Sequence, residues 1–336
     1  MFEPRDPCTK LLSPLVIGHG STAIRVPHRL FLAPMSGVSD LPFRRIAYRE
    51  GAALVFSEMV ASRELTEGHA ESELRMAGEG LPVHAVQLAG REARWMGEAA
   101  RRAEANGADL IDINMGCPAK KVTGGASGSA LMRDLDHALT LIEATVAAVR
   151  VPVSVKMRLG WDEASMNAPD LARRAEGAGA SMLTVHGRTR SQFYEGTANW
   201  DAVAAVVAAV GIPVVVNGDV RDPGTAAMAM ARSGAAAVMI GRACYGQPWL
   251  VGSIAEALRG DRAHRGNERA MAVEHYEALL EHFGVPIGLR CARKHVRWYG
   301  ERFGIDPGLL SEALRSDDPA FVRSVLGRDA PTAIAA

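Results

Sequence analysis

The sequence predicts an α/β protein: a closed (β/α)₈ TIM barrel followed by a smaller all-helical C-terminal domain. Eight short apolar or β-branched runs recur between residues 30 and 242, and Ala-rich stretches with helical spacing separate most of them. Such regular alternation indicates right-handed crossovers and a parallel sheet. Eight units in roughly 215 residues fit this barrel, which usually takes about 250 residues.

Each predicted strand has its own apolar run. In chain order these are 30–35 (LFLAPM), 54–60 (LVFSEMV), 84–88 (HAVQL), 110–115 (LIDINM), 153–158 (VSVKMR), 182–187 (MLTVHG), 214–219 (VVVNGD) and 237–242 (AVMIGR). The helices between them are expected at 91–106, 134–150, 170–178 and 223–233. A doubly wound open sheet is the alternative, but no G-x-G-x-x-G motif follows the first run, so the barrel is favoured.

The pattern changes after Gly241. No strand candidate follows Arg242, and the segments 268–283 and 289–303 have a period of 3.6 residues. We therefore expect four parts, with loose order at both ends. They are a loosely ordered N-terminal extension over 1–20, the barrel over 21–254, a helical domain over 255–329 and a flexible tail over 330–336.

Composition limits the partners and the cellular compartment that we expect for the protein. Lys plus Arg and Asp plus Glu each number 38, so only a local patch can favour an acidic partner. The four cysteines are far apart and form no C-x-x-C pair, which argues against zinc and disulfides and fits a reducing cytoplasm. The N-terminus lacks a signal peptide, and no apolar run approaches the roughly 20 residues of a membrane span. We expect a soluble cytoplasmic protein with no metal and no membrane partner, and we take it to be a monomer.

Polar residues lie at the carboxyl ends of the predicted strands, which form the catalytic face of such a barrel. Gln87 and Lys156 stand out because an amide or a charge within an apolar run needs a partner. Taken singly, each is better explained as a structural residue, but eight such strand ends together favour a ligand site. The other candidates at this rim are Pro34, Met35, Ser36, Glu58, Asn114, Arg158, His186, Arg188, Asn217, Asp219 and Arg242.

The residues that follow the last two predicted strands narrow the choice of ligand. Gly218 and Gly241 follow the seventh and eighth runs, where barrels of this kind bind phosphate through backbone N–H groups. The alternative is that each glycine only permits a tight turn. A phosphate site there, with Gln87 and Lys156 nearby, fits flavin mononucleotide (FMN). Lys156 would face the N1–C2=O edge of the flavin, and Gln87 would hydrogen-bond to the ring.

A cysteine, Cys117, follows the fourth strand in the segment DINMGCPAKK. A thiol with a pKa near 8.5 is mostly protonated at pH 7, so it serves as an acid. Beside a flavin, an acid suits hydride transfer from flavin N5 to an activated C=C bond, with a proton delivered to the adjacent carbon. The alternative is a small apolar residue in a turn, which is our interpretation of Cys8, Cys244 and Cys291.

The segment 289–303 predicts a helix with one basic face. Arg290, Arg293, Lys294 and Arg297 are spaced i, i+3, i+4 and i+7, and apolar residues fall on the opposite face. The basic face can meet phosphates; the alternative is a solvated face of an amphipathic helix. Lys120 and Lys121 add positive charge near the expected pocket.

Together these motifs resemble the tRNA-dihydrouridine synthases, most of all their bacterial B-type branch. The matching segments span residues of about 30 to 300 and are LFLAPMSGVSDLPFR, SEMV, VQLAG, DINMGCPAKKV with GSALM, VKMRLGW, TVHGRTR, PVVVNGDV, VMIGRACYGQPW and RKHVRWYG. The resemblance implies an FMN-binding barrel, a helical domain that helps hold folded tRNA, and NADPH as the reductant of FMN. It implies reduction of the C5=C6 bond of a D-loop uridine, with position seventeen expected from the B-type likeness.

The resemblance also implies roles for individual residues. Hydride passes from flavin N5 to C6, and Cys117 gives the proton to C5. The FMN site comprises Pro34, Met35, Ser36, Gln87, Lys156, His186, Asn217, Gly218, Asp219, Gly241 and Arg242. Substrate contacts come from Asn114, Arg158, Arg188, Lys120, Lys121, Arg290, Arg293, Lys294 and Arg297. One departure is the segment 123–127 (TGGAS), which is smaller and less charged than the family pattern.

Three other functions remain open from the sequence. An FMN enzyme that reduces or oxidises a free pyrimidine or enone would need no basic helix. A non-catalytic RNA-binding protein would have no use for Cys117 and Lys156. A cofactor-free phosphate-sugar isomerase would lack flavin absorbance near about 450 nm.

Overall fold

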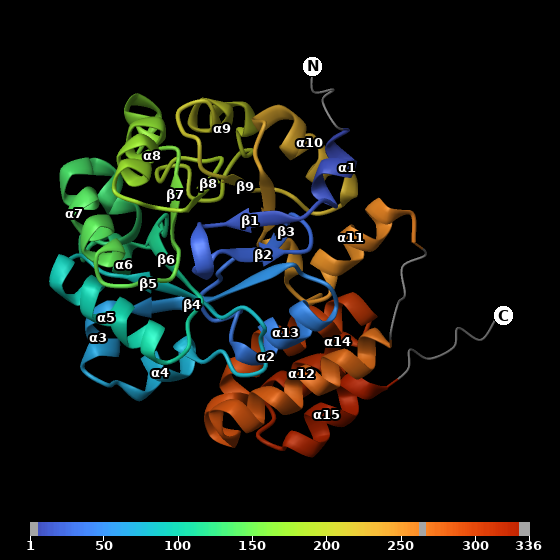
Figure 1. Ribbon diagram of the computed structural model, residues 1–336. Coiled ribbons are helices and arrows are strands. Elements are labelled where there is room, and N and C mark those ends of the chain that lie inside the picture. The colour runs from blue at the N-terminus through green and yellow to red at the C-terminus, as the bar shows by residue number, and fades with distance from the viewer. Residues whose placement is uncertain (1–5, 262–266, 329–336) are drawn as a thin grey trace.

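The computed structural model describes residues 6–261 and 267–328. Eight parallel strands close into a barrel in the order β10-β3-β4-β5-β6-β7-β8-β9 (Figure 1). They are β3 (Leu30–Leu32), β4 (Leu54–Ala61), β5 (Ala85–Ala89), β6 (Leu110–Met115), β7 (Val153–Arg158), β8 (Met182–His186), β9 (Val214–Asn217) and β10 (Ala237–Ile240). The predicted barrel is confirmed, and each observed strand overlaps its predicted run.

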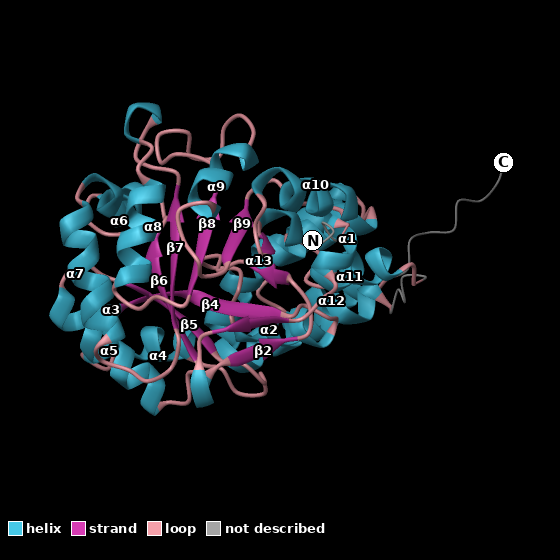
Figure 2. Ribbon diagram, turned by 45° about the horizontal axis from the view of Figure 1, so that its top comes forward, coloured by secondary structure: helices cyan, strands magenta, loops and turns pink. Residues whose placement is uncertain are grey.

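Helices surround the strands, as Figure 2 shows with helices in cyan around magenta strands. They are α2 (Leu41–Arg49), α3 (Ser62–Thr66), α4 (Ala70–Met76), α5 (Ala93–Ala105), α6 (Lys120–Thr123), α7 (Leu135–Val146), α8 (Ala168–Gly177), α9 (Trp200–Val207), α10 (Pro223–Ser233) and α11 (Leu250–Arg259). Helix α10 illustrates how local sequence sets these bounds. The Asp222 carboxylate accepts the N–H of Thr225, Pro223 occupies the first turn, and Gly234 ends the helix at φ +67°.

The inner and outer faces of the barrel differ in polarity on the side of β5 to β9. Side chains alternate between the two faces along a strand, and paired residues on neighbouring strands share a face. The side chains of Lys156 on β7 and Asn217 on β9 meet at 3.3 Å across the intervening β8, which requires the concave inner face. The alternate residues, such as Val155 and Val216, therefore point outward, where they join the hydrophobic core under the helices.

The N-terminal extension is ordered from residue 7, so the expectation of loose order over residues 1–20 is wrong for that part. Helix α1 (Pro7–Leu11) and the antiparallel pair β1 (Leu15–Ile17) and β2 (Ile24–Val26) follow one another, joined by a short 3₁₀ turn. Leu11 and Ile17 are fully buried. Lys10 Nζ donates to the carbonyl of Ala235 at 2.8 Å. The extension is ordered because it covers apolar surface near the N-terminal ends of the barrel strands, a contact that local sequence does not reveal. Residues 1–5 lie outside the described part.

The helical domain consists of α12 (Glu268–Phe283), α13 (Val285–Phe303), α14 (Pro307–Arg315) and α15 (Pro319–Gly327), beside α2 and α11 in Figure 1. Its apolar residues form a second hydrophobic cluster, which Ile46 and Trp249 of the barrel join. The expected boundary at residue 255 falls within α11. Val251, Ile254 and Ala255 of α11 pack into the barrel core, because α11 completes the helical layer. The predicted tail over 330–336 lies outside the described residues. Across 6–261 and 267–328, no helix combines the length and hydropathy needed to cross a membrane.

Candidate active site

A chain of buried hydrogen bonds crosses the inside of the barrel from β5 to β7. Gln87 Nε2 donates to Asp112 Oδ2 at 2.7 Å, and Ser154 Oγ donates to Asp112 Oδ1 at 2.6 Å. Asn114 Nδ2 donates to Gln87 Oε1 at 2.8 Å. The amide predicted at Gln87 therefore has a fixed orientation. Asp112, which holds it, was missed by sequence reasoning, although it lies two residues before Asn114 on the same face.

The same chain reaches the loop that carries Cys117. Asn114 Oδ1 accepts hydrogen bonds from the backbone N–H groups of Gly116 and Cys117, at 3.2 and 3.0 Å. On the other side, Ser129 Oγ donates to the carbonyl of Cys117 at 2.9 Å. Gly128 has φ +60°, and a Cβ there would come within 2.8 Å of that carbonyl. Cys117 is half-buried, in a loop that is fixed from both sides.

Four further predicted residues meet on the inner face of β7, β8 and β9. Arg158 pairs in register with His186, and His186 pairs with Asn217. Lys156 Nζ donates to Asn217 Oδ1, and Asn217 Nδ2 donates to the carbonyl of Met239 at 2.8 Å. Since all of these side chains share one face, they line the C-terminal end of the barrel.

Two buried polar atoms on β8 have no hydrogen-bond partner among the described residues: Thr184 Oγ1 and His186 Nδ1. Buried polar groups are usually satisfied, and leaving one unpaired costs about 1–3 kcal/mol. Thr184 pairs in register with Lys156, so both orphaned atoms belong to the row just described. The row is therefore suited to a polar ligand that supplies the missing partners.

Burial shapes the protonation of this row. It raises the pKa of Asp112 above its ordinary value, and the hydrogen bonds from Ser154 and Gln87 offset this only in part. Burial, then the charge of Arg158, lowers the pKa of Lys156, while Asp112 and Cys117 oppose the shift. Burial also lowers the pKa of His186 well below its usual value, so this imidazole is neutral at pH 7. Perturbed groups of this kind gathered at one end of a barrel are typical of functional sites.

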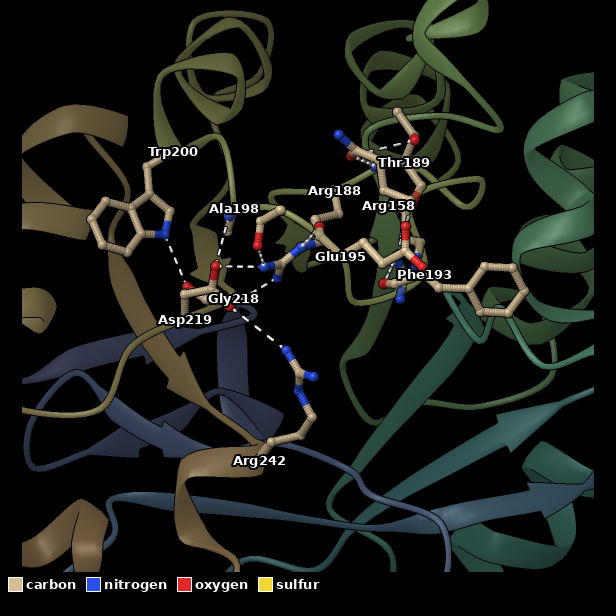
Figure 3. Close-up of polar contacts among 12 residues, drawn as sticks. Arg158, Arg188, Thr189, Phe193, Glu195, Ala198, Trp200, Gly218, Asp219 and Arg242 are labelled. Carbon is tan, nitrogen blue, oxygen red and sulfur yellow. Dashed lines mark hydrogen bonds and ion pairs between the residues drawn. The ribbon is translucent and has the colours of Figure 1, made fainter.

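Arg188 and Asp219 form an ion pair at the barrel mouth (Figure 3). Arg188 is 1% exposed, and its guanidinium donates to both carboxylate oxygens of Asp219, at 2.9 and 2.6 Å. It also donates to the carbonyls of Glu195 and Gly196. Burial raises the pKa of Asp219, but hydrogen bonds from Arg188 and the Ala198 amide outweigh burial, and the net pKa lies below its usual value. The structure thus gives Arg188 and Asp219 a shared role in fixing the loop after β8.

Arg158 is also held by backbone carbonyls. It is 2% exposed and donates to the carbonyl of Gly116 at 2.9 Å. It also donates to the carbonyls of Thr189 and Phe193 at 2.8 Å (Figure 3). Burial lowers its pKa to about 10. These bonds tie the loop after β8 to the loop that carries Cys117. We expected Arg158 and Arg188 to contact the substrate directly. Both guanidinium groups are instead buried and hydrogen-bonded within the protein, so neither is exposed for such a contact.

The loops after the first and last barrel strands also come together. Met35 is buried, and its Sδ would lie 3.9 Å from a Cβ on Gly241. Pro34 is half-buried and Ser36 exposed. Arg242, next to Gly241, is exposed and lies over the ring of Tyr194 at 4.3 Å. Tyr194 is 50% exposed and was missed by sequence reasoning; nothing in its local pattern marks it.

The basic face of α13 is divided in the structure. Arg290 and Arg297 are exposed, and Arg293 is exposed but pairs with Asp317 at 3.3 Å. Lys294 turns toward the barrel, since a Cβ on Gly37 would lie 2.9 Å from its Nζ. The opposite face, with Leu289, Ala292, Val296 and Tyr299, is buried as predicted.

Near Cys117, Lys120 is exposed on α6. The side chain of Lys121 lies outside the part of the chain that the structure describes.

A separate cleft of about 280 Å³ opens on the outside of the barrel, between α11 and the helical domain. Trp249 and Arg302 line it, and Arg302 pairs with Glu268 at 3.1 Å. The polar row with its orphaned atoms lies elsewhere, at the barrel mouth, which is the better candidate for chemistry.

Comparisons with known proteins agree with this architecture. The family described as Dihydrouridine synthase (Dus) matches residues 31–309. A protein of Rhizobium leguminosarum bv. phaseoli described as "Probable tRNA-dihydrouridine synthase" is 59% identical over 278 residues, covering 83% of this chain and 87% of that protein. The "tRNA-dihydrouridine synthase B" of Xanthomonas axonopodis pv. citri (strain 306) is 46% identical, covering 81% and 84%.

Solved structures with low sequence identity share the fold. A structure of morphinone reductase aligns with a TM-score of 0.54 at 16% identity, covering 75% of this chain and 90% of that one. A structure of 6-hydroxypseudooxynicotine amine oxidase from Pseudomonas geniculata N1 aligns with a TM-score of 0.59 at 15% identity, covering 77% and 51%. These likenesses support the barrel alone.

Proposed function

Because the chain belongs to the dihydrouridine synthase family, we propose that it is a flavin-dependent tRNA-dihydrouridine synthase. Its substrate is a D-loop uridine of folded tRNA, and its product has a saturated C5–C6 bond. The observation that carries the proposal is the position of Cys117, partly exposed and held by Asn114 beside the polar row of the barrel mouth. An enzyme of this class needs one acid at a fixed distance from the reacting base.

The residues at the barrel mouth fit FMN. Thr184 Oγ1 and His186 Nδ1 lack partners among the described residues, and a flavin ring offers donors and acceptors on its polar edge. Gly218 has φ +118°, and a Cβ there would come within 2.8 Å of Ala198 and 3.4 Å of His186 Nε2. Its missing side chain leaves the backbone open to a ligand. The residues proposed to hold FMN are Pro34, Met35, Ser36, Gln87, Lys156, His186, Asn217, Gly218, Gly241 and Arg242.

Asp219 is proposed to support this site rather than to touch the cofactor, since both of its carboxylate oxygens bind Arg188. A flavin held by these residues and reduced by NADPH would be the source of the hydride that is added at C6 of the uracil.

The protein supplies the proton. Cys117 Sγ–H gives its proton to C5, and the sulfur remains as a thiolate. The thiolate is stabilised by Lys156 and Arg158, and its negative charge opposes the lowering of their pKa values by burial. The neutral His186 adds no competing acid at pH 7, because burial holds its pKa low.

The tRNA must bring a base into the barrel mouth, which requires unstacking it at a cost of a few kcal/mol. The exposed Arg290 and Arg297 of α13 are proposed to contact the RNA backbone. We propose further substrate contacts for Lys120, Lys121, Arg293 and Lys294. Asn114 is proposed to act on the substrate indirectly, by holding the Cys117 loop.

The experiment is mass spectrometry of tRNA from cells that lack this gene, complemented with the wild-type gene or with Cys117→Ala. The expected result is loss of dihydrouridine at one D-loop position, with seventeen expected, restored only by the wild type. Unchanged dihydrouridine in the deletion strain, with turnover of free uracil by the purified protein, would instead favour a small-molecule reductase.

A further inference from the structure

Three buried side chains meet where the barrel joins the helical domain. Asp40 precedes α2 of the barrel, His275 lies on α12 and His295 lies on α13. One potential ligand atom from each, a carboxylate oxygen and two ring nitrogens, lies within 4.8 Å of the others. His275 Nε2 is 3.9 Å from Asp40 Oδ1, which is too far for a hydrogen bond.

The two histidines have unused nitrogens. Among the described residues, neither ring nitrogen of His295 has a hydrogen-bond partner, and neither does Nε2 of His275. His275 is 0% exposed and His295 is 1% exposed, so bulk water does not reach them. The ring of His295 packs edge-on against those of His275 and Trp298, contacts that leave nitrogen lone pairs unsatisfied. Something other than these side chains must satisfy three buried nitrogens.

The surroundings of His275 match those of a metal ligand. Its Nδ1 forms a hydrogen bond with the hydroxyl of Tyr299 at 3.0 Å, which leaves Nε2 facing Asp40. Histidines that bind metals usually hold their second nitrogen in this way. Asp40 Oδ1 also accepts the N–H of Phe43 as the cap of α2, and a carboxylate has lone pairs enough for both partners.

We propose that Asp40, His275 and His295 form a Zn²⁺ site that ties α12 and α13 to the barrel. Ligands at about 2.0–2.2 Å from Zn²⁺ lie roughly 3.3–3.5 Å apart in a tetrahedral site, so these atoms need to move together by less than about 1.5 Å. Three protein ligands leave the fourth position to water. We took the cysteine spacing as evidence against zinc, but that spacing bears only on thiolate ligands, so this proposal replaces the expectation of no metal.

The charges nearby favour zinc over hard cations. Arg44 interacts electrostatically with Asp40, and Lys294 with His295. Mg²⁺ and Ca²⁺ depend on several oxygen ligands, and among the three proposed ligands only Asp40 offers oxygen. Zn²⁺ binds imidazole nitrogen well and tolerates a single carboxylate.

Such a site would act on the orientation of α13. His295 lies between Lys294, which reaches toward Gly37 of the barrel, and the exposed Arg297. A metal bonded to Asp40 therefore fixes the basic face of α13 relative to the barrel mouth. The loss of zinc would loosen the junction of the two domains and lower the melting temperature, because the metal binds only the folded arrangement.

The test uses the full chain without a histidine tag. Wild-type protein is stripped with a chelator, incubated with ZnCl₂ and desalted, and the retained zinc is measured by mass spectrometry. The expected result is one zinc ion per chain and a higher melting temperature than that of the stripped protein. His295→Gln removes a ligand and should weaken zinc binding by more than the roughly 10–100-fold typical of changes to residues that only orient the ligands, and Asp40→Asn, which keeps the helix cap, should also weaken it. His69→Gln, at an exposed histidine, is the matched control and should bind like the wild type.

Wild-type protein that retains no zinc would overturn the proposal whether or not the variants fold, and would leave buried water as the partner of these nitrogens. Equal zinc retention by wild type, Asp40→Asn and His295→Gln would overturn it as well. Co²⁺ gives a second readout, since a tetrahedral ion with nitrogen and oxygen ligands absorbs visible light much more strongly than octahedral, hydrated Co²⁺ does. Absence of that absorbance from wild-type protein that retains the metal would place the ion elsewhere and also reject the site.

Discussion

The side-chain oxygen of Asn114 accepts a hydrogen bond from the backbone N–H of Cys117 at 3.0 Å. Through its nitrogen, Asn114 is bonded to Gln87, and Gln87 to the buried Asp112. The loop that carries the thiol is thus anchored to the interior of the barrel by a continuous set of hydrogen bonds. This anchor predicts that the position of the thiol depends on residues that never touch the substrate.

Asn114→Ala should slow tRNA reduction on the order of 100-fold while flavin stays bound, because a reacting group misplaced by about 1 Å can lose that much rate. The measurement is single-turnover formation of dihydrouridine by flavin-loaded enzyme. Asn106→Ala, at the end of α5, is the control and should react like the wild type. A normal rate in Asn114→Ala would show that the loop holds its position without this anchor.

Cys117→Ala should keep its flavin and still oxidise NADPH, but form dihydrouridine at least about 100-fold more slowly, the usual contribution of a general acid. Flavin absorbance measures cofactor binding, NADPH oxidation measures flavin reduction, and nucleoside mass spectrometry measures dihydrouridine formation. Cys8→Ala, on α1 near the opposite end of the barrel, serves as control. If Cys117→Ala modified tRNA at the wild-type rate, the thiol would not be the acid.

Asp219→Asn should destabilise the protein by about 3 kcal/mol, the lower end of the range for leaving a buried charge without its partner. The charge left alone is Arg188, whose side chain is 2% exposed, whereas Asp219 is 27% exposed. Urea denaturation measures the effect. Asp201→Asn, which breaks an exposed pair with Arg232, should change stability little.

This effect should depend on pH in one direction. The pKa of Asp219 in the folded protein lies below its ordinary value, so the pair contributes fully above the unfolded pKa of about 3.9. The contribution is lost as the pH falls through the lower, folded pKa. The stability difference between wild type and Asp219→Asn should therefore shrink below about pH 4. A difference that stayed constant from pH 7 to pH 3 would mean that the ion pair is not its source.

Arg290→Ala combined with Arg297→Ala should weaken tRNA binding, because fewer RNA phosphates are then neutralised by the protein. The slope of log affinity against log salt should decrease by about 1 for each phosphate that the variant no longer neutralises. Flavin reduction by NADPH should not change. Arg94→Ala combined with Arg101→Ala, at exposed arginines on α5, is the matched control for the removed charge. If the salt dependence did not change, Arg290 and Arg297 would not neutralise RNA phosphates, and the basic face of α13 would only be exposed to solvent.

Much of this protein is determined by local sequence. The alternation of apolar runs and helical segments was sufficient to predict the barrel. The period-two pattern of LIDINM and VSVKMR separates the polar face of each strand from its apolar face. Strand closure then brings Gln87, Asn114, Lys156 and His186 to one end, since parallel strands place their carboxyl ends together. Helix α12 was predicted with the bounds that the structure shows.

Other features depend on contacts between segments far apart in the chain. The local sequence HGRTR does not predict that Arg188 turns inward to Asp219. Likewise, the local sequence of residues 7–17 does not predict that this segment covers the barrel. Asp40, His275 and His295 come from three helices or their caps, and only the docking of two domains brings them together. Local periodicity specifies which face of an element is apolar, but which partner covers that face is decided by packing, and packing is a property of the tertiary structure.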